Sequence, residues 1–245
     1  MAEELSLPAG ENLSWWQRCL GVFLDPVRTF ASVVRQPGFW APLIALVVIS
    51  FATTQALIRR VGMEQVVRRS LEMSGRASNM TPEQLERAVA VAAKVGSISA
   101  NIASLIGVPI VLVIIAALGL LIMKVVYGQS PSFKAAFSVA AHADLPMLIA
   151  GILTLMVIAF GDPASMNPGN LSPTNIGFFL SPQTTSKAVY SLATSADVFS
   201  LWVLGLLGVG FAATSSGKAR PRAIFGCFFA LWVIWVLIKT GLALI

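Results

Sequence analysis

Five long apolar runs dominate this 245-residue sequence and restrict what it can fold into. Each run is about 20 residues or longer, and at about 1.5 Å per helical residue it can cross the roughly 30 Å hydrocarbon core of a bilayer. The runs do not alternate apolar and polar residues as barrel strands do, so they favour helices, which pair their backbone groups internally in lipid. Only 11% of the chain is charged, against roughly 25% in soluble domains. The sequence therefore predicts an all-α polytopic membrane protein, a bundle of five transmembrane helices at about 39–58, 98–123, 135–160, 196–214 and 222–244.

Basic residues between these runs predict which way the chain crosses the membrane, because Lys and Arg concentrate in cytoplasmic loops. The second-to-third and fourth-to-fifth connections are basic, whereas the long connection at about 161–195 holds only Lys187. This pattern places the N-terminus in the cytoplasm and the C-terminus outside. Residues 59–97 do not fit this orientation, because it would place their seven basic residues outside. They also carry four glutamates, however, and resemble a folded amphipathic element rather than a bare loop. No basic stretch precedes an apolar core at the N-terminus, so we expect no cleavable signal peptide.

Residues 1–38 are predicted to form a cytoplasmic N-terminal tail and an interfacial helix. Asp25 can cap this helix, Pro26 suits its first position, and Val27 and Phe30 begin an apolar stripe at helical spacing. Because the helix directly precedes the first run, we expect it to lie at headgroup depth on the cytoplasmic side. The alternative is an ordinary helix packed on the cytoplasmic ends of the spans.

Residues 39–245 are predicted to form the transmembrane domain, with an extramembrane helical hairpin between spans one and two. The hairpin turns at residues 75–80, Gly-Arg-Ala-Ser-Asn-Met. Thr81 and Gln84 then have capping-box spacing, and Pro82 suits the first helical position. This second arm can run without interruption into span two.

A candidate polar site lies inside the third run. The run contains the only histidine of the chain, His142, with Asp144 two positions further on and Pro146 two beyond that. Asp144 follows Lys134 by about ten residues, or about 15 Å of straight helix, which is near the bilayer midplane. An ionised carboxylate at that depth is costly unless it is paired or hydrated. We therefore expect either a proton-coupling or ligand site, or a neutral carboxyl that is hydrogen-bonded to another helix.

Helical geometry separates the members of this candidate site. Positions two apart point to different faces, so His142 and Asp144 are not expected to form a pair, and His142 is expected to make a satisfied polar contact. Pro146 removes a helix hydrogen bond and predicts a bend, which transporters use at binding sites and passive bundles also tolerate. Asp197 precedes the fourth run, where a carboxylate caps the helix and favours its positive end.

Five motifs, taken in their order along the chain, resemble those of a known family. They are DPVRTFASVVRQPGFWAPL, TPEQLERAV, VVYGQSPSFKAAFSV, ADLPML and DVFSLWVLGLLGVGFAATSSGKAR. Together they resemble the bacterial branch of the Yip1 family of multi-span membrane proteins, from about residue 18 to the end. The resemblance implies five spans, a cytoplasmic N-terminus and no enzymatic activity. Eukaryotic relatives act in vesicle trafficking and contact Rab GTPases, but this chain lacks their long N-terminal domain and their Asp-Leu-Tyr-Gly-Pro motif, so Rab binding is not carried over.

The sequence shows no phosphate loop, nucleophile elbow, metal-binding helix pair or paired catalytic carboxylates, so we expect no catalytic residue, no metal ligand and no cofactor. Cys19 and Cys227 are too far apart in sequence to suggest a metal or disulfide motif. The net charge of +6 fits basic cytoplasmic loops, and no nucleic-acid partner is expected.

The predicted function is that of a non-enzymatic integral protein of a bacterial inner (plasma) membrane. It would act through contacts with membrane lipid, with protein partners or with further copies of itself, as a scaffold in membrane organisation or a trafficking-like process. The alternative is a small transporter or transporter-accessory subunit that uses the polar site around Asp144 and Pro146, with a substrate that no motif identifies.

Overall fold

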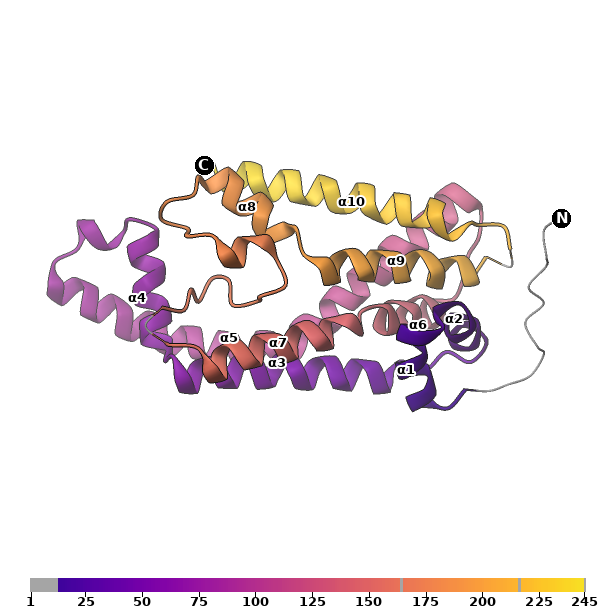
Figure 1. Ribbon diagram of the computed structural model, residues 1–245, viewed down its shortest axis with the longest axis horizontal. Coiled ribbons are helices and arrows are strands. Elements are labelled where there is room, and N and C mark those ends of the chain that lie inside the picture. The colour runs from indigo at the N-terminus through magenta and orange to yellow at the C-terminus, as the bar shows by residue number, and fades with distance from the viewer. Residues whose placement is uncertain (1–12, 164, 216, 245) are drawn as a thin grey trace. The chain divides into compact units, whose positions relative to one another are not determined.

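The structure is a computed structural model and describes residues 13–163, 165–215 and 217–244. These residues fold mainly as helices (Figure 1), and none of them belongs to a β-strand. Residues 1–12 of the predicted N-terminal tail lie outside the described part. The α-helices are α1 (Trp15–Leu24), α2 (Pro26–Arg35), α3 (Trp40–Arg60), α4 (Met63–Met73), α5 (Pro82–Tyr127), α6 (Phe133–Ala143), α7 (Pro146–Phe160), α8 (Lys187–Ser195), α9 (Val198–Ala213) and α10 (Pro221–Leu242), and two 3-10 turns are η1 (Ala77–Asn79) and η2 (Ile176–Phe179).

Four helical stretches in the described chain are long and apolar enough to cross a membrane: α3, α5, α10 and the stretch from Phe133 to Phe160 that joins α6 and α7. The apolar helix α9 is shorter, with 16 residues, or about 24 Å. Each predicted run coincides with one of these helices, and α5 extends the second run to 46 residues. Length and composition thus confirm a multi-pass, all-helical membrane protein.

The predicted helix after Asp25 coincides with α2, and Asp25 Oδ1 accepts a hydrogen bond from Arg28 N (3.2 Å) at its start. A further helix that the sequence did not predict, α1, precedes it and ends at Asp25. The third run breaks where Pro146 predicts a bend, since α6 ends at Ala143 and α7 begins at Pro146. Proline has no N–H to donate, so the helix ladder is interrupted where its ring enters the chain.

The described chain divides into two compact units. Unit 1 contains the described residues of 13–44, 111–146 and 201–232, and unit 2 contains the described residues of 45–110, 147–200 and 233–244.

The interior of unit 1 is closely packed. Helices α1, α2 and α6 contact one another, and Phe30 of α2 has no exposed surface. Phe30 therefore faces protein, whereas Val27, which begins the expected apolar stripe, is 54% exposed. A Cβ on Gly210 of α9 would come within 2.5 Å of Val139 Cγ1 and 3.0 Å of the Phe30 ring, so this approach requires glycine.

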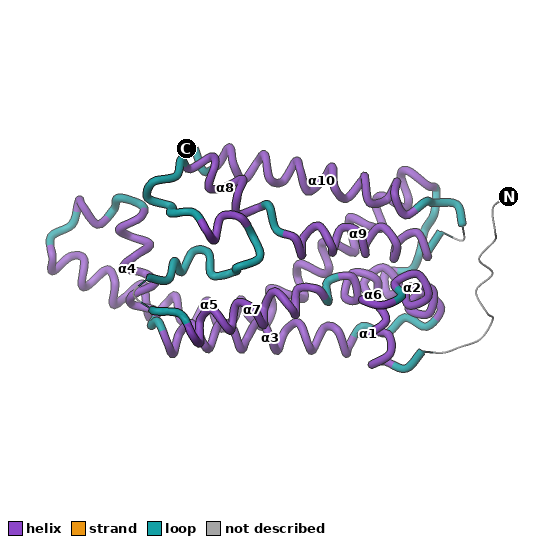
Figure 2. Tube along the Cα trace, in the orientation of Figure 1, coloured by secondary structure: helices purple, strands orange, loops and turns teal. Residues whose placement is uncertain are grey.

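Unit 2 is joined by polar contacts between its segments. In Figure 1, α4 lies beside the first turns of α5, and Arg68 of α4 forms a salt bridge with Glu86 of α5 at 2.8 Å. Gln55 Nε2 of α3 donates to Asn101 Oδ1 of α5, which pairs two amides within the apolar helices. Irregular segments, drawn in teal in Figure 2, connect α7, η2 and α8.

Candidate functional site

The predicted intramembrane site lies at the turn between α6 and α7. Asp144 ends α6, with its backbone N–H donating to Ala140 O at 3.0 Å, and Pro146 opens α7. The His142 carbonyl, near the hydrogen bond that proline removes, is satisfied because Leu145 N donates to it at 3.2 Å. The turn is therefore made without leaving the His142 carbonyl unpaired in an apolar environment.

The side chains at this turn behave differently. His142 is 2% exposed, and its Nδ1 lies 2.8 Å from Ser138 O, one turn earlier on α6. Asp144 is half-buried, and no hydrogen bond or ion pair to its carboxylate is present among the described residues. No hydrogen bond joins His142 to Asp144, so the structure does not bring the two together as an acid–base pair.

The three predicted cap residues lie at helix starts. Besides the Asp25 contact described above, Thr81 Oγ1 accepts from Gln84 N (3.3 Å) while Thr81 N donates to Gln84 Oε1 (2.9 Å) at the start of α5. Asp197 Oδ1 accepts from Phe199 N (2.8 Å) at the start of α9. These contacts satisfy N–H groups that the helices themselves leave unpaired.

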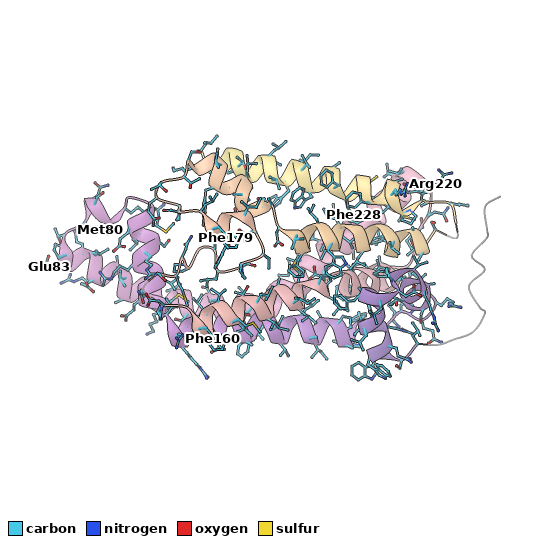
Figure 3. All side chains as sticks on the ribbon, in the orientation of Figure 1. Met80, Glu83, Phe160, Phe179, Arg220 and Phe228 are labelled. Atoms are coloured by element: carbon cyan, nitrogen blue, oxygen red, sulfur yellow. The ribbon has the colours of Figure 1, made fainter. Side chains whose placement is uncertain are left out.

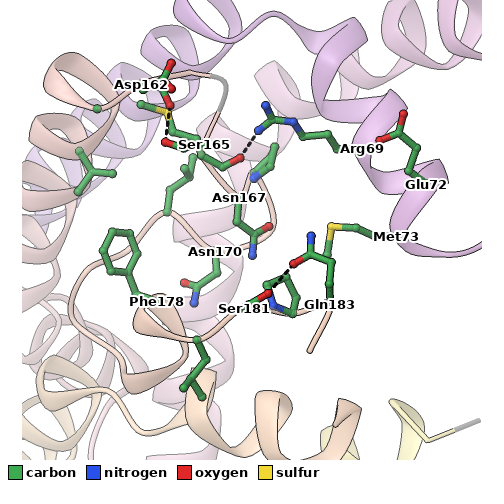
Figure 4. A pocket seen from close by; sticks show the side chains of 17 residues that line it. Arg69, Glu72, Met73, Asp162, Ser165, Asn167, Asn170, Phe178, Ser181 and Gln183 are labelled. Carbon is green, nitrogen blue, oxygen red and sulfur yellow. Dashed lines mark hydrogen bonds between the residues drawn. The ribbon is translucent and has the colours of Figure 1, made fainter. Parts of the chain in front are cut away.

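A cavity of about 680 Å³ lies in unit 2, outside the intramembrane turn (Figure 4). Its walls come from α4, the end of α7, η2 and the irregular segment at 161–183. They include apolar side chains such as Met73 and Phe178, the amide of Gln183, and the charged residues Arg69 and Glu72. Asp144 is not among its lining residues.

Arg69 fixes one wall of this cavity. Its Nη2 donates to Pro163 O at 3.0 Å and its Nη1 donates to Met166 O, so α4 is bonded to a segment that follows it by more than 90 residues. The carbonyl oxygens would otherwise lack partners in an irregular segment, and a charged donor makes the stronger kind of hydrogen bond. The guanidinium therefore fixes the position of the 161–171 segment against α4.

Amide side chains fix another part of the cavity wall. Asn170 and Asn175 bond to each other in both directions at 2.9 Å, and Asn175 Oδ1 also accepts from Phe178 N at 3.0 Å, which caps η2. Asn167 Nδ2 donates to the Tyr190 hydroxyl of α8 at 2.7 Å. These bonds give the irregular segment a defined course.

Sequence reasoning missed this cavity. Its residues come from segments with no shared periodicity: Arg69 and Glu72 belong to the charged segment 59–97, and most of the others belong to the connection at about 161–195. Helix α8 did carry a local signal: Ser186 can cap a helix, and its Oγ accepts from Val189 N at 3.4 Å.

Among the described residues, no group of three or more His, Cys, Asp or Glu side chains is placed to hold a metal ion.

The comparisons agree with the class that the fold defines, a multi-pass membrane protein. The family model of the Yip1 domain matches residues 20–240, nearly the whole chain. The chain therefore belongs to the Yip1 domain family, whose members are generally non-enzymatic membrane proteins. Neither the comparison with curated proteins nor that with solved structures gives a match.

Proposed function

We propose that this Yip1-family protein acts without catalysis, through contacts with protein or lipid, as a scaffold in membrane organisation or trafficking-like processes. Its contact surface comprises α4, the α5 turns at residues 82–97, and residues 161–195. The observation that carries this proposal is the docking of the long segment onto α4 by Arg69. Apolar side chains are exposed on this surface, among them Phe179 at 76% and Met73 at 49%, and they offer apolar area that a partner can bury.

We further propose a topology of five spans with a cytoplasmic N-terminus and an outer C-terminus, in a bacterial inner membrane, with α9 as the fourth span. The Arg69 contacts support this topology, because they require α4 and the 161–171 segment to lie on the same side of the membrane. Two spans, α5 and the α6–α7 stretch, separate these segments in sequence and return the chain to that side.

The N-terminal helix α1 is proposed to lie in the cytoplasmic interface. Trp15 (69%), Trp16 (51%), Leu20 (55%) and Leu24 (84%) are exposed, while Arg18 on the opposite face is 8% exposed. Tryptophan and leucine on one face of a helix beside a span suit the boundary between headgroups and acyl chains. Burial lowers the pKa of Arg18, and its Nη1 donates to Gln36 O at 2.7 Å, which holds α1 against the residues that precede α3.

Cysteine labelling of intact cells tests the topology. A charged maleimide that cannot cross the membrane should modify Phe179→Cys directly, but should modify Lys218→Cys, in the connection between α9 and α10, only after the membrane is opened. A reporter active only outside the cytoplasm should be active when fused to the C-terminus. Modification of both positions in intact cells, or an inactive C-terminal reporter, would contradict the proposed five-span topology.

Photo-crosslinking tests the contact function. A photoreactive residue at position 179 or 73 in native membranes should give defined adducts with a lipid, a second copy or a protein partner, whereas the same residue at exposed position 218 should not. An absence of adducts at 179 and 73, or equal yields at all three positions, would contradict the proposed surface.

A second candidate function, a small transporter or transporter-accessory subunit, is favoured by the break between α6 and α7. Interrupted helices line binding sites in many transporters, and Asp144 lies at this break with no described partner. Flux into proteoliposomes tests whether the protein transports a given substrate. A transporter should lose flux in Asp144→Asn, while equal flux in wild type, variant and empty liposomes contradicts transport of that substrate.

A further inference from the structure

The cavity in unit 2 has the dimensions of a small-molecule site. Its volume of about 680 Å³ falls within the roughly 300–1,000 Å³ that such sites occupy. Its residues belong to α4, the end of α7 and the 161–183 segment, so it is built by the Arg69 docking described above. Glu72 and Met73 are exposed, which leaves the α4 side of the cavity open to solvent.

One side of the cavity is apolar and adaptable. Met73 approaches from α4 and Met166 from the irregular segment, with Phe178 and Leu180 from the region of η2. Methionine side chains are flexible and polarisable, so they accommodate apolar bodies of different shape. The Phe178 ring is also suited to a cation, because the face of an aromatic ring attracts positive charge.

The charges of the cavity are unequal. Its ionisable lining residues are one base, Arg69, and two acids, Glu72 and Asp162. The Arg69 guanidinium already donates to the carbonyls of Pro163 and Met166, which leaves it poorly available to an anion. The Glu72 carboxylate, in contrast, makes no hydrogen bond or ion pair with any described residue, and it is drawn in Figure 4 on the α4 wall. The cavity therefore favours positive over negative ligands.

We propose that this cavity binds an organic cation with an apolar body, its ammonium group at Glu72 and its apolar part against Met73, Met166 and Phe178. This inference goes beyond the contact function, because it assigns a small-molecule site to the chain. It can be tested independently of the contact function, because the test needs only purified protein and no partner.

The test uses two probes that share one apolar body, phenylbutylamine and phenylbutyrate. Met73→Cys, in full-length protein in nanodiscs of neutral phosphatidylcholine, is alkylated with and without each probe, and peptide mass spectrometry separates the new thiol from Cys19 and Cys227. The amine should slow alkylation at position 73 about fivefold more than the carboxylate does, the effect of one exposed charge pair. Met80→Cys, which lies outside the cavity, should show no protection.

Two matched variants connect this protection to the proposed residue. In the Met73→Cys background, Glu72→Gln should abolish the preference for the amine, whereas Glu83→Gln, at an exposed acid on α5 outside the cavity, should preserve it. Equal protection by both probes, protection that survives Glu72→Gln, or no protection by either probe would each overturn the proposal. Retained helical circular dichroism in every variant excludes unfolding as the cause of a lost effect.

Discussion

The interiors of the two units differ in what holds them together. In unit 1, glycine and alanine allow close approach: Ala136 and Ala140 of α6 have no exposed surface, and a Cβ on Gly119 of α5 would lie only 1.9 Å from Phe211 Cζ of α9. In unit 2, side chains join segments by directed bonds, as Arg69 does. Between helices in lipid the hydrophobic effect contributes little to association, so small residues and dispersion contacts stabilise the packing instead. Segments outside the apolar spans rely instead on caps, ion pairs and amide bonds.

The largest expected effect breaks the packing of unit 1. Gly119→Ala should destabilise the protein by about 1–3 kcal/mol, because the added methyl group overlaps the fully buried Phe211 ring. Thermal unfolding in detergent, followed by circular dichroism, measures this loss. Gly205→Ala on α9 is the control, since no atom lies within 4 Å of its Cβ position, and it should leave the unfolding temperature almost unchanged. Equal losses in both variants would contradict the packing explanation.

A second change breaks the polar docking of unit 2. Arg69→Ala should release residues 161–171 from α4 and increase their amide hydrogen exchange by at least about tenfold, because two charged-donor bonds are lost. Exchange in α6 should not change. Arg68→Ala removes only the exposed pair with Glu86 and is the matched control, with an expected effect below about 1 kcal/mol. If the two variants exchange alike, Arg69 does not hold the segment.

A third change addresses the end of α8. Lys239 Nζ of α10 donates to Thr194 Oγ1 and Ser195 Oγ, each at 3.1 Å, where a cation also favours the negative end of the helix. Lys239→Met keeps the apolar stem and removes both bonds, so exchange of the last turn of α8 should rise by about threefold to tenfold. Lys239→Arg should restore most of the protection. An unchanged exchange rate in Lys239→Met would exclude the proposed anchor.

The smallest expected effect concerns the half-buried Cys19 thiol of α1. Burial raises the pKa of this thiol, so at pH 8 the folded protein should hold less thiolate than an exposed cysteine, and maleimide should react a few times more slowly. The difference in rate should shrink as pH rises, because both the folded and the unfolded protein then hold mostly thiolate. Stopped-flow alkylation at increasing pH, with protein unfolded in dodecyl sulfate as reference, measures the difference. Superimposable pH profiles would show that Cys19 is not shielded.

Local signals in the sequence were sufficient for much of this fold. The apolar runs gave the long helices, Thr81 and Pro82 gave the start of α5, and Pro146 marked the break in the third run. Asp25 and Pro26 likewise indicated the start of α2, whereas α1, which precedes it, was not predicted. The local signal for α1 is the spacing of Trp16, Leu20 and Leu24, which places them on one helix face.

The cavity was beyond reach for a different reason. Arg69 and Pro163 are 94 residues apart, and nothing local to either residue states that they meet. Arginine on an exposed helical face has the same sequence appearance whether it is solvated or bonded to a distant carbonyl. Only the folding of the intervening spans decides between the two, so contacts of this kind come from tertiary structure rather than from pattern.

The Arg69 docking also has a consequence for the order of synthesis. At about 5–20 residues per second, a ribosome needs about 5–20 s to make the 94 residues that separate Arg69 from Pro163. Throughout that interval α4 has been made, but its carbonyl partners do not yet exist and the guanidinium remains hydrated. The surface that α4 and the docked segment form is therefore completed late, after three apolar stretches have been synthesised, and a chain stalled before residue 163 would present α4 uncovered to quality-control proteases.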